Sequence, residues 1–226
     1  MNSLYIVSTP IGNLEDITLR AIRILKEVSL ILCEDTRHSF HLLQHYEITT
    51  PTASYHDFNK EKVGSKYIDH LMKVGSIALI SDAGTPGLAD PAFNLVRDAR
   101  KENIPVYPIP GASALLSALV ASGVPTDRFQ FENFPSKKSA TRLRDLELLK
   151  ETATCTLCFY ASPHNILKFL AEIQTVFGEI RICLARELTK KFEEFRTDTP
   201  TGHLKWYKER SPKGEFVLMF HPQDKG

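Results

Sequence analysis

Residues 76–91 read SIALISDAGTPGLADP and join a short apolar run to a loop of small, turn-forming residues. The apolar run, residues 76–80, predicts a buried strand. Gly84, Pro86 and Gly87 in the loop after it are typical of tight turns. Residues 90–101 then show the apolar spacing of an amphipathic helix. A strand, a loop and a helix in this order indicate one unit of a parallel sheet covered by helices.

The same alternation runs through the first half of the chain. Apolar runs predict four further strands, at residues 4–7, 30–33, 53–56 and 105–109. Residues 17–28 repeat apolar side chains at helical spacing, with Asp16 or Thr18 available as the helix cap. We therefore expect an α/β N-terminal domain over residues 1–112, with a mainly parallel sheet.

After residue 112 the pattern becomes mixed. Helices are predicted at residues 113–121, around 138–150, at 163–177 and in a short segment with Trp206. Strands are predicted at residues 154–160, 181–188, 192–197 and 215–221. Because two of these strands follow one another directly, we expect a mixed α+β C-terminal domain over residues 113–226.

Each predicted strand of the N-terminal domain ends in an unusual loop. In chain order the loops read STPIGNLED, EDTRH, YHD, SDAGTPGLADP and PGASA. Ordinary turn chemistry explains any one of them. Five such loops at the carboxyl edge of one parallel sheet instead favour a ligand-binding cleft.

The loops also restrict the kind of cofactor. The sequence has neither a G-x-G-x-x-G fingerprint nor a Walker lysine loop, which argues against the usual dinucleotide and nucleoside-triphosphate sites. Backbone N–H and C=O groups in rigid Gly/Pro loops can bind an adenine edge, and Asp and Thr side chains can hold ribose hydroxyls. These loops therefore suit a nucleoside cofactor without a phosphate chain.

Composition excludes several classes of protein. The chain has 226 residues, 42% of them hydrophobic, which is enough for a well-packed core. Its apolar runs are far shorter than the ~20 residues of a membrane helix, and its first residues lack a signal-peptide pattern. We expect a cytoplasmic protein without a membrane partner. The formal net charge of +1 provides no global attraction for nucleic acid, so RNA binding would need a local basic patch.

Cys155 and Cys158 form a lone C-x-x-C motif. No second Cys or His pair in the sequence stands at metal-ligand spacing. The two cysteines also lie in a β-branched run, where residues three apart point to opposite faces of a strand. We expect buried structural thiols and no metal site, with zinc as the minor alternative.

Eight ordered stretches closely resemble the 16S ribosomal RNA (cytidine-2′-O)-methyltransferases of the tetrapyrrole methylase superfamily. They span about residues 4–220 and read VSTPIGNLEDITLRA, CEDTRHS, SYHDFN, LISDAGTPGLADP, PIPGASALLSALVASGVPTDRF, FYASPHNIL, ARELTKKFEE and KGEFVL. The resemblance implies a two-domain tetrapyrrole-methylase-like fold that holds S-adenosyl-L-methionine between its domains, usually as a homodimer. It implies methyl transfer to the 2′-hydroxyl of a cytidine in the decoding region of 16S rRNA, in the small ribosomal subunit.

The resemblance also indicates the cofactor positions. On this chain they are Pro10, Asp82, Gly84, Thr85, Pro86, Gly111, Ser113, Phe159, Tyr160, Ala185, Arg186, Glu187 and Gly214. The chain departs from the family pattern at four positions. The family usually has serine at Ala89, proline at Ala112 and glycine at Asn133, and often a basic residue at Asn165.

Methyl transfer to a ribose hydroxyl needs a base or a positioned acceptor, because that hydroxyl is a poor nucleophile at neutral pH. We predict Glu34, Asp35 and Arg37 as catalytic candidates, with Arg37 orienting the RNA. Other titratable candidates are His38, His56, Asp82 and Glu187. For each carboxylate at a helix start, a helix cap is the competing interpretation.

RNA also needs cations. Residues 133–144 contain four basic side chains and no acid, and two phenylalanines, Phe131 and Phe134, stand at its start. We predict phosphate contacts from Lys137, Lys138, Arg142 and Arg144, extended by Arg186, Lys190 and Lys191. A solvated helix face is the alternative for this charge run.

Two other functions stay open at this point. A methylase of a small tetrapyrrole would share the fold but would not need the basic segment at residues 137–144. A non-catalytic RNA-binding module would not bind S-adenosylmethionine.

Overall fold

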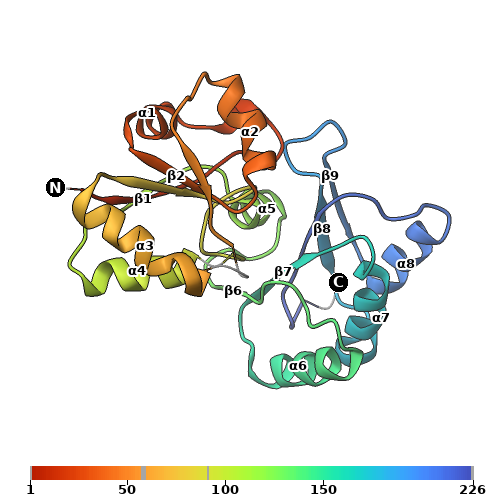
Figure 1. The fold of residues 1–226 in the computed structure, drawn as a ribbon. Helices are drawn as coiled ribbons and strands as arrows, with labels where there is room; N and C mark the ends of the chain where they lie inside the picture. The colour runs from red at the N-terminus through yellow and green to blue at the C-terminus, as the bar shows by residue number, and fades with distance from the viewer. Residues whose placement is uncertain (1, 57–59, 91, 225–226) are drawn as a thin grey trace. The chain divides into compact units, whose positions relative to one another are not determined.

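The computed structural model describes residues 2–56, 60–90 and 92–224 of the chain (Figure 1). Its internal contacts divide the chain into two compact units, Met1–Ser113 and Ala114–Gly226. The predicted boundary after residue 112 lies beside this division. Each unit has its own five-stranded sheet and its own hydrophobic core.

The sheet of the first unit is parallel in every described pairing. Its strands are β1 (Leu4–Val7), β2 (Leu30–Cys33), β3 (Thr52–Ser54), β4 (Ile77–Ile80) and β5 (Val106–Ile109). Their order across the sheet is β3-β2-β4-β1-β5. The bounds of β1 and β2 are those predicted, and β4 and β5 each begin one residue later than predicted. The prediction of a mainly parallel sheet is confirmed.

Helices cover both faces of this sheet (Figure 1). They are α1 (Leu19–Glu27), α2 (Thr36–His45), α3 (Lys60–Lys73) and α4 (Ala92–Lys101), and a short 3-10 helix, η1 (Leu14–Asp16), precedes α1. α1 and α2 pack on one face with Val7 and Ile80, and α3 and α4 pack on the other with Leu4 and Leu79. Alternate residues of each strand thus enter different cores, and β4 is buried along its whole length.

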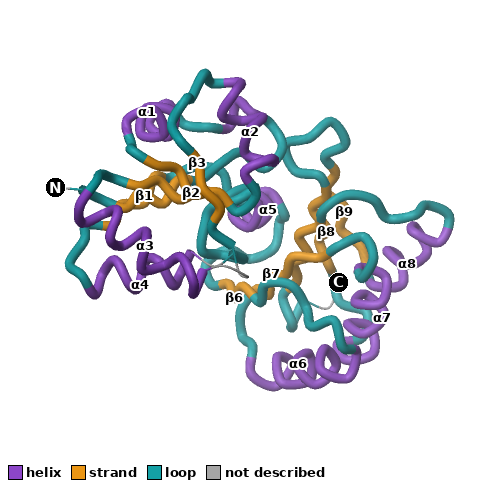
Figure 2. The backbone as a smooth tube through the Cα atoms, viewed as in Figure 1, coloured by secondary structure: helices purple, strands orange, loops and turns teal. Residues whose placement is uncertain are grey.

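The second unit is a mixed α+β structure, as predicted. Its elements are α5 (Ala114–Ala121), β6 (Phe129–Phe131), α6 (Ser139–Thr152), β7 (Thr156–Ala161), α7 (Ile166–Phe177), β8 (Ile182–Arg186), β9 (Glu194–Asp198), α8 (Pro200–Lys208) and β10 (Phe216–Phe220). The strand order is β6-β7-β10-β8-β9. Figure 2 draws the strands of this unit in orange and its helices, among them α6, α7 and α8, in purple. β6 pairs with β7 in parallel, and the other described pairs are antiparallel. Helices α6, α7 and α8 share one core with the sheet, and α5 contacts β7 and β10.

Candidate functional site

Two loops of the first unit are joined at the carboxyl ends of neighbouring strands. β1 lies between β4 and β5, so the loops that follow these three strands are adjacent. The backbone N–H of Thr9 donates to the carbonyl of Gly84 at 2.9 Å, and the N–H of Gly84 donates to the carbonyl of Thr9 at 3.0 Å. The hydroxyl oxygens of Ser8 and Thr85 lie 2.9 Å apart. The structure therefore brings the loop of Pro10 and the predicted residues Gly84 and Thr85 together.

The loop after β5 meets the same place. The Thr85 hydroxyl donates to the carbonyl of Ala112 at 3.1 Å. A Cβ atom added at Gly111 would stand 2.9 Å from the Cβ of Ser8, closer than real Cβ atoms come. Gly84 has a φ of +81°, a left-handed backbone that glycine adopts at little cost. Close approach of the loops therefore requires glycine at 111, and backbone conformation favours it at 84.

A fourth loop is tied in through Asp82. Its Oδ1 accepts the backbone N–H of Asp35 at 3.0 Å, which links the loop after β2 to the loop after β4. Pro86 and Ser113 are buried, and Asp82 is half-buried. The loop after β3 runs into residues 57–59, so its predicted Asp57 lies outside the described residues. Four of the five predicted loops thus lie at the carboxyl edge of the sheet and are hydrogen-bonded to one another.

Three of these four loops, those after β1, β4 and β5, favour a neutral or cationic ligand. We define the loop cluster as residues 8–16, 81–90 and 110–113, which contain no Lys or Arg. Their polar groups are backbone amides, hydroxyls and carboxylates such as that of Asp82. A phosphate chain would find no counter-charge there, whereas an adenine edge, ribose hydroxyls and a sulfonium or ammonium group would find acceptors. The residues present fit a nucleoside cofactor without phosphates.

Of the predicted catalytic residues, Glu34 and Asp35 lie between β2 and α2, and Arg37 lies in the first turn of α2. The Asp35 carboxylate accepts two hydrogen bonds from the Arg37 guanidinium, at 3.1 and 2.7 Å, and one from the Arg37 backbone N–H at 2.9 Å. These bonds hold the pKa of Asp35 well below its ordinary range. Asp35 therefore serves to hold Arg37 and the start of α2, and it does not suit the role of general base. Glu34, the third candidate, is half-buried at the end of β2.

In the second unit, the predicted neighbours Phe159 and Tyr160 point to opposite faces of β7. The Phe159 side chain is 4% exposed and packs on Phe169, with ring centroids 5.1 Å apart. It belongs to the core, so the prediction of a cofactor contact is wrong for this side chain. Tyr160 is half-buried against Phe131 and Phe134, at centroid distances of 4.8 and 5.4 Å, and burial raises its pKa.

The ARELTKK stretch forms a dense network of ion pairs after β8. Arg186 donates to Glu194 at 3.1 Å across the β8–β9 pair. The Glu187 carboxylate accepts the backbone N–H of Glu215 and the Lys190 ammonium, both at 3.0 Å. Lys190 also donates to the Glu215 carboxylate at 2.8 Å. Two carboxylates therefore balance the charge of Lys190, which weakens the prediction that it extends the RNA-binding patch.

Two further predicted cofactor residues, Gly214 and Ala185, lie beside this network of ion pairs. Gly214 has a φ of +87°, and a Cβ added there would collide with the Glu187 side chain. Ala185 is fully buried in β8. Burial opposes ionisation of Glu187, but the Glu215 backbone N–H and Lys190 outweigh it and lower the Glu187 pKa. This end of β8 is therefore rigid and carries a stable carboxylate.

The basic segment divides into exposed and buried residues. Lys137, Lys138 and Arg144 are exposed, whereas Arg142 is 6% exposed. The Arg142 guanidinium binds the Glu172 carboxylate through two hydrogen bonds, of 2.6 and 2.7 Å. The prediction that Arg142 docks phosphate is therefore wrong, because its charge is already paired inside the unit. Helical spacing turns Arg142 toward α7, while Arg144 points to solvent.

Glu172 was not among the residues predicted from the sequence. It is an acid on α7 beside Phe169 and Ile173, which both lie in the core. An acid in register with core positions needs a buried partner, because an unpaired buried charge is costly. The position of Glu172 among core residues of α7 was therefore the sequence signal that could have predicted a buried basic partner.

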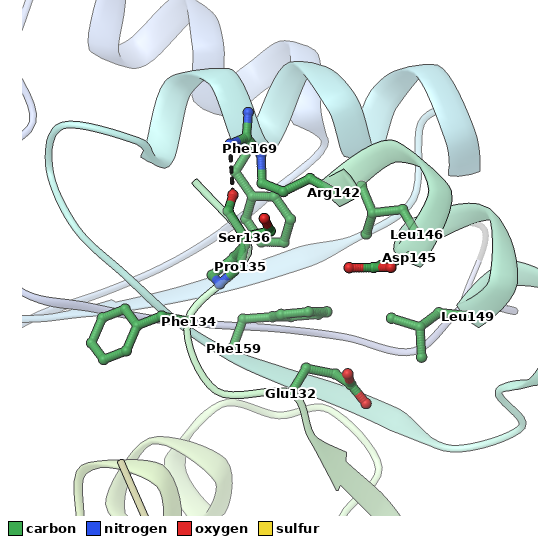
Figure 3. A pocket seen from close by; sticks show the side chains of 10 residues that line it. All are labelled: Glu132, Phe134, Pro135, Ser136, Arg142, Asp145, Leu146, Leu149, Phe159 and Phe169. Atoms are coloured by element: carbon green, nitrogen blue, oxygen red, sulfur yellow. Dashed lines mark hydrogen bonds between the residues drawn. The ribbon is translucent and has the colours of Figure 1, made fainter. Parts of the chain in front are cut away.

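A small hollow lies beside this segment (Figure 3). It holds about 350 Å³ of empty space, part of it open solvent. Core residues, among them Leu146, Leu149, Phe159 and Phe169, form its apolar side, and Arg142 forms part of its wall. It is thus a gap at the edge of the packed core.

The four cysteines are free thiols. Cys158 lies in β7, whereas Cys155 precedes that strand. Burial raises the pKa of Cys158 to about 12. No group of three or more His, Cys, Asp or Glu side chains suited to a metal occurs in the described part of the chain. Over the same residues, every helix is too short or too polar to cross a membrane.

Residues 3–204 match the tetrapyrrole (corrin/porphyrin) methylases. The chain belongs to the tetrapyrrole methylase family. Among the relatives of this chain are two proteins named ribosomal RNA small subunit methyltransferase I. The one from Halalkalibacterium halodurans is 48% identical over 96% of this chain and 75% of its own length. The one from Pseudomonas aeruginosa is 50% identical over 96% of this chain and 78% of its own length.

A solved structure shows the same fold. Uroporphyrin-III C-methyltransferase from Thermus thermophilus, complexed with S-adenyl homocysteine, is similar with a TM-score of 0.65. Sequence identity is 18%, and the match covers 98% of each chain. The tetrapyrrole methylase fold is therefore kept at low sequence identity.

Two positions at which the sequence departs from the pattern that the resemblance predicts have structural explanations. Asn133, where the family resemblance predicts glycine, has a φ of +60°. Asparagine tolerates this left-handed backbone better than most residues, so the turn is retained. At Ala112, where the family resemblance predicts proline, the contribution to the loop cluster is the carbonyl oxygen, which either residue supplies.

Proposed function

We propose that this chain is an S-adenosylmethionine-dependent methyltransferase of small-subunit ribosomal RNA, which methylates the ribose 2′-hydroxyl of a cytidine in 16S rRNA. The single observation that supports S-adenosylmethionine as the cofactor is the loop cluster. Its three loops are hydrogen-bonded to one another at one edge of the sheet and contain no Lys or Arg. The RNA substrate is supported by the names of relatives that are 48% and 50% identical to the chain.

The loop cluster contributes the cofactor-binding surface of the first unit. When bound, S-adenosylmethionine supplies an electrophilic methyl group on a sulfonium. Backbone groups near Gly84 and Ala112 hold the nucleoside, and the Asp82 carboxylate favours a cationic ligand. The Thr9–Gly84 bridge and the Ser8–Thr85 contact keep these groups in fixed positions before binding. From the second unit we propose contributions from Tyr160, Arg186, Glu187 and Gly214.

The chain must also hold the reacting hydroxyl in line with the methyl group, about 3–3.5 Å from it. Arg37, exposed at the start of α2 and held by Asp35, is placed to orient an RNA phosphate or ribose. Of the two carboxylates predicted as catalytic after β2, Glu34 is the better candidate for proton removal, because the Asp35 carboxylate is engaged by Arg37. Lys137, Lys138 and Arg144 of the second unit dock phosphates of the RNA.

The test is a methyl-transfer assay with purified protein, methyl-labelled S-adenosylmethionine and either free 16S rRNA or small subunits lacking the modification. We expect label in RNA, at one nucleotide that resists alkaline cleavage because its 2′-oxygen is methylated. RNA in which that cytidine is 2′-deoxy is the control and should take no label. Label on a base, or transfer to a tetrapyrrole and none to RNA, would overturn the proposal.

We also propose that the protein is a cytoplasmic homodimer, which follows from the family resemblance and the ribosomal substrate. Light scattering at micromolar concentration should give twice the mass of one chain. A monomeric mass at that concentration would contradict the dimer and leave the proposed reaction untouched.

A further inference from the structure

The buried Arg142 does more than pair with Glu172. One of its terminal nitrogens donates to the carbonyl of Ser136 at 2.8 Å (Figure 3). The same nitrogen donates to the carbonyl of Lys137 at 3.1 Å. A single guanidinium thus bonds the backbone just before α6 and the carboxylate on α7 at the same time. Lysine could not replace it, because only the planar fork of arginine presents donors in several fixed directions.

Glu172 holds the other side of the same turn. Its carboxylate accepts the Ser139 hydroxyl at 2.5 Å, in addition to the two bonds from Arg142. The backbone N–H of Arg142 donates to the carbonyl of Lys138, the first bond of α6. Bonds from one ion pair therefore fix residues on both sides of Lys138.

The two lysines in this fixed turn have free side chains. Lys137 and Lys138 are exposed, and within the described residues neither makes an ion pair. Their backbone is thus held from inside the unit while their ammonium groups face solvent. A preformed pair of cations binds a polyanion with less loss of conformational freedom than a mobile loop would.

We propose that Arg142, together with Glu172, is a positioning residue for RNA: it fixes the turn at residues 136–139 so that Lys137 and Lys138 meet neighbouring phosphates. This inference rests on the proposed RNA substrate. It replaces the earlier idea of a direct Arg142–phosphate contact with an indirect role, exerted through the two lysines.

The main test variant is the double substitution Arg142→Met/Glu172→Met. Replacing a buried ion pair with apolar residues of similar volume is often tolerated, whereas removing one partner alone leaves an uncompensated charge. The variant should stay folded, with an unchanged far-ultraviolet spectrum and unchanged S-adenosylmethionine affinity. We expect RNA KM to rise about tenfold with kcat nearly unchanged, and the log–log salt slope of RNA binding to flatten by about 1.

Two companion variants separate positioning from general stability. Lys150→Met removes a side-chain bond from α6 to the carbonyl of Val176 on α7, at the other end of the same helix pair. It should leave RNA KM unchanged. Lys137→Gln/Lys138→Gln should raise RNA KM and flatten the salt slope by itself. In that background, Arg142→Met/Glu172→Met should have little further effect, because the pair acts through the lysines.

The outcomes are distinct. If the lysine variant weakens RNA binding but the folded Arg142→Met/Glu172→Met variant does not, the positioning role is wrong and the proposed function stands. Additive effects of the two double substitutions would also contradict it. If wild-type protein methylates no RNA, the proposed function itself fails.

Discussion

The hydroxyl oxygens of Ser8 and Thr85 lie 2.9 Å apart, although the two residues are 77 positions apart in the chain. Each follows a parallel strand, β1 and β4, and the Thr85 hydroxyl also donates to the carbonyl of Ala112 after β5. One threonine thus joins three strand ends. Its neighbour Gly84 has a left-handed backbone that sets the path of the loop, so a side chain at position 84 should disturb all three loops.

Gly84→Val should abolish S-adenosylmethionine binding in a protein that still folds. Valine at a φ of +81° is strained, and its Cβ would also stand 3.3 Å from the side chain of Ile11. Isothermal calorimetry should show at least a tenfold loss of affinity. Gly178→Val is the matched control, because Gly178 has a φ of +78° with open space around it and lies outside the loop cluster. Equal affinities in both variants would refute this placement of the cofactor.

Replacing Lys137, Lys138 and Arg144 with glutamine should weaken RNA binding and leave S-adenosylmethionine binding unchanged. Each lost phosphate contact flattens the log–log salt slope by about 0.7 for single-stranded RNA, so three contacts amount to about 2. Filter binding over a range of salt concentrations measures the slope. An unchanged slope would mean that these residues are a solvated face, and Arg37 would be the next cation to test.

Acid should destabilise the protein partly through Glu172. Burial opposes its ionisation, but Arg142 and Ser139 outweigh burial and hold the Glu172 pKa below its ordinary value. This stabilisation is present above the unfolded pKa and is lost as pH falls through the folded pKa. Urea unfolding measures the free energy of unfolding at pH 7 and near pH 3. The decrease between these two pH values should be smaller for Arg142→Met/Glu172→Met than for wild type.

Glu172→Ala alone should lower the free energy of unfolding by about 3–5 kcal/mol at pH 7, because it leaves the buried Arg142 guanidinium without a counter-charge. The same urea titrations measure this cost as a loss of unfolding free energy. A loss below about 1 kcal/mol would show that water reaches Arg142 and that the pair is not truly buried.

Thiol labelling at pH 8 should modify at most Cys155 in the native protein. Burial raises the pKa of Cys33 to about 11 and that of Cys158 to about 12, so both stay protonated and covered. Cys183 is buried as well. All four thiols should react after unfolding in guanidinium chloride. Rapid native labelling of Cys158, suppressed by zinc, would revive the metal interpretation of the C-x-x-C motif.

Local patterns were sufficient for much of the fold. The bounds of β1 and β2 could be predicted because each is a short apolar run ended by a polar loop. Thr18 was one of two possible caps of α1, and its hydroxyl does accept the Ala21 N–H. Helices α2 and α3 were not predicted individually. Their place was implied only by the parallel strands they connect.

By itself, the sequence determined the alternation of strands and helices, the positions of the strand-end loops and the family resemblance, all of which are written in contiguous residues. Only the tertiary structure decided which polar side chains are available. Arg142 and Arg144 look alike in the sequence, yet one is buried against Glu172, 30 residues away, and the other is exposed. Phe159 and Tyr160 are likewise neighbours in the sequence, yet Phe159 lies in the core and Tyr160 is half-buried on the opposite face of β7. The physical reason is that burial and charge pairing depend on distant partners, which the local period of a helix or strand does not encode.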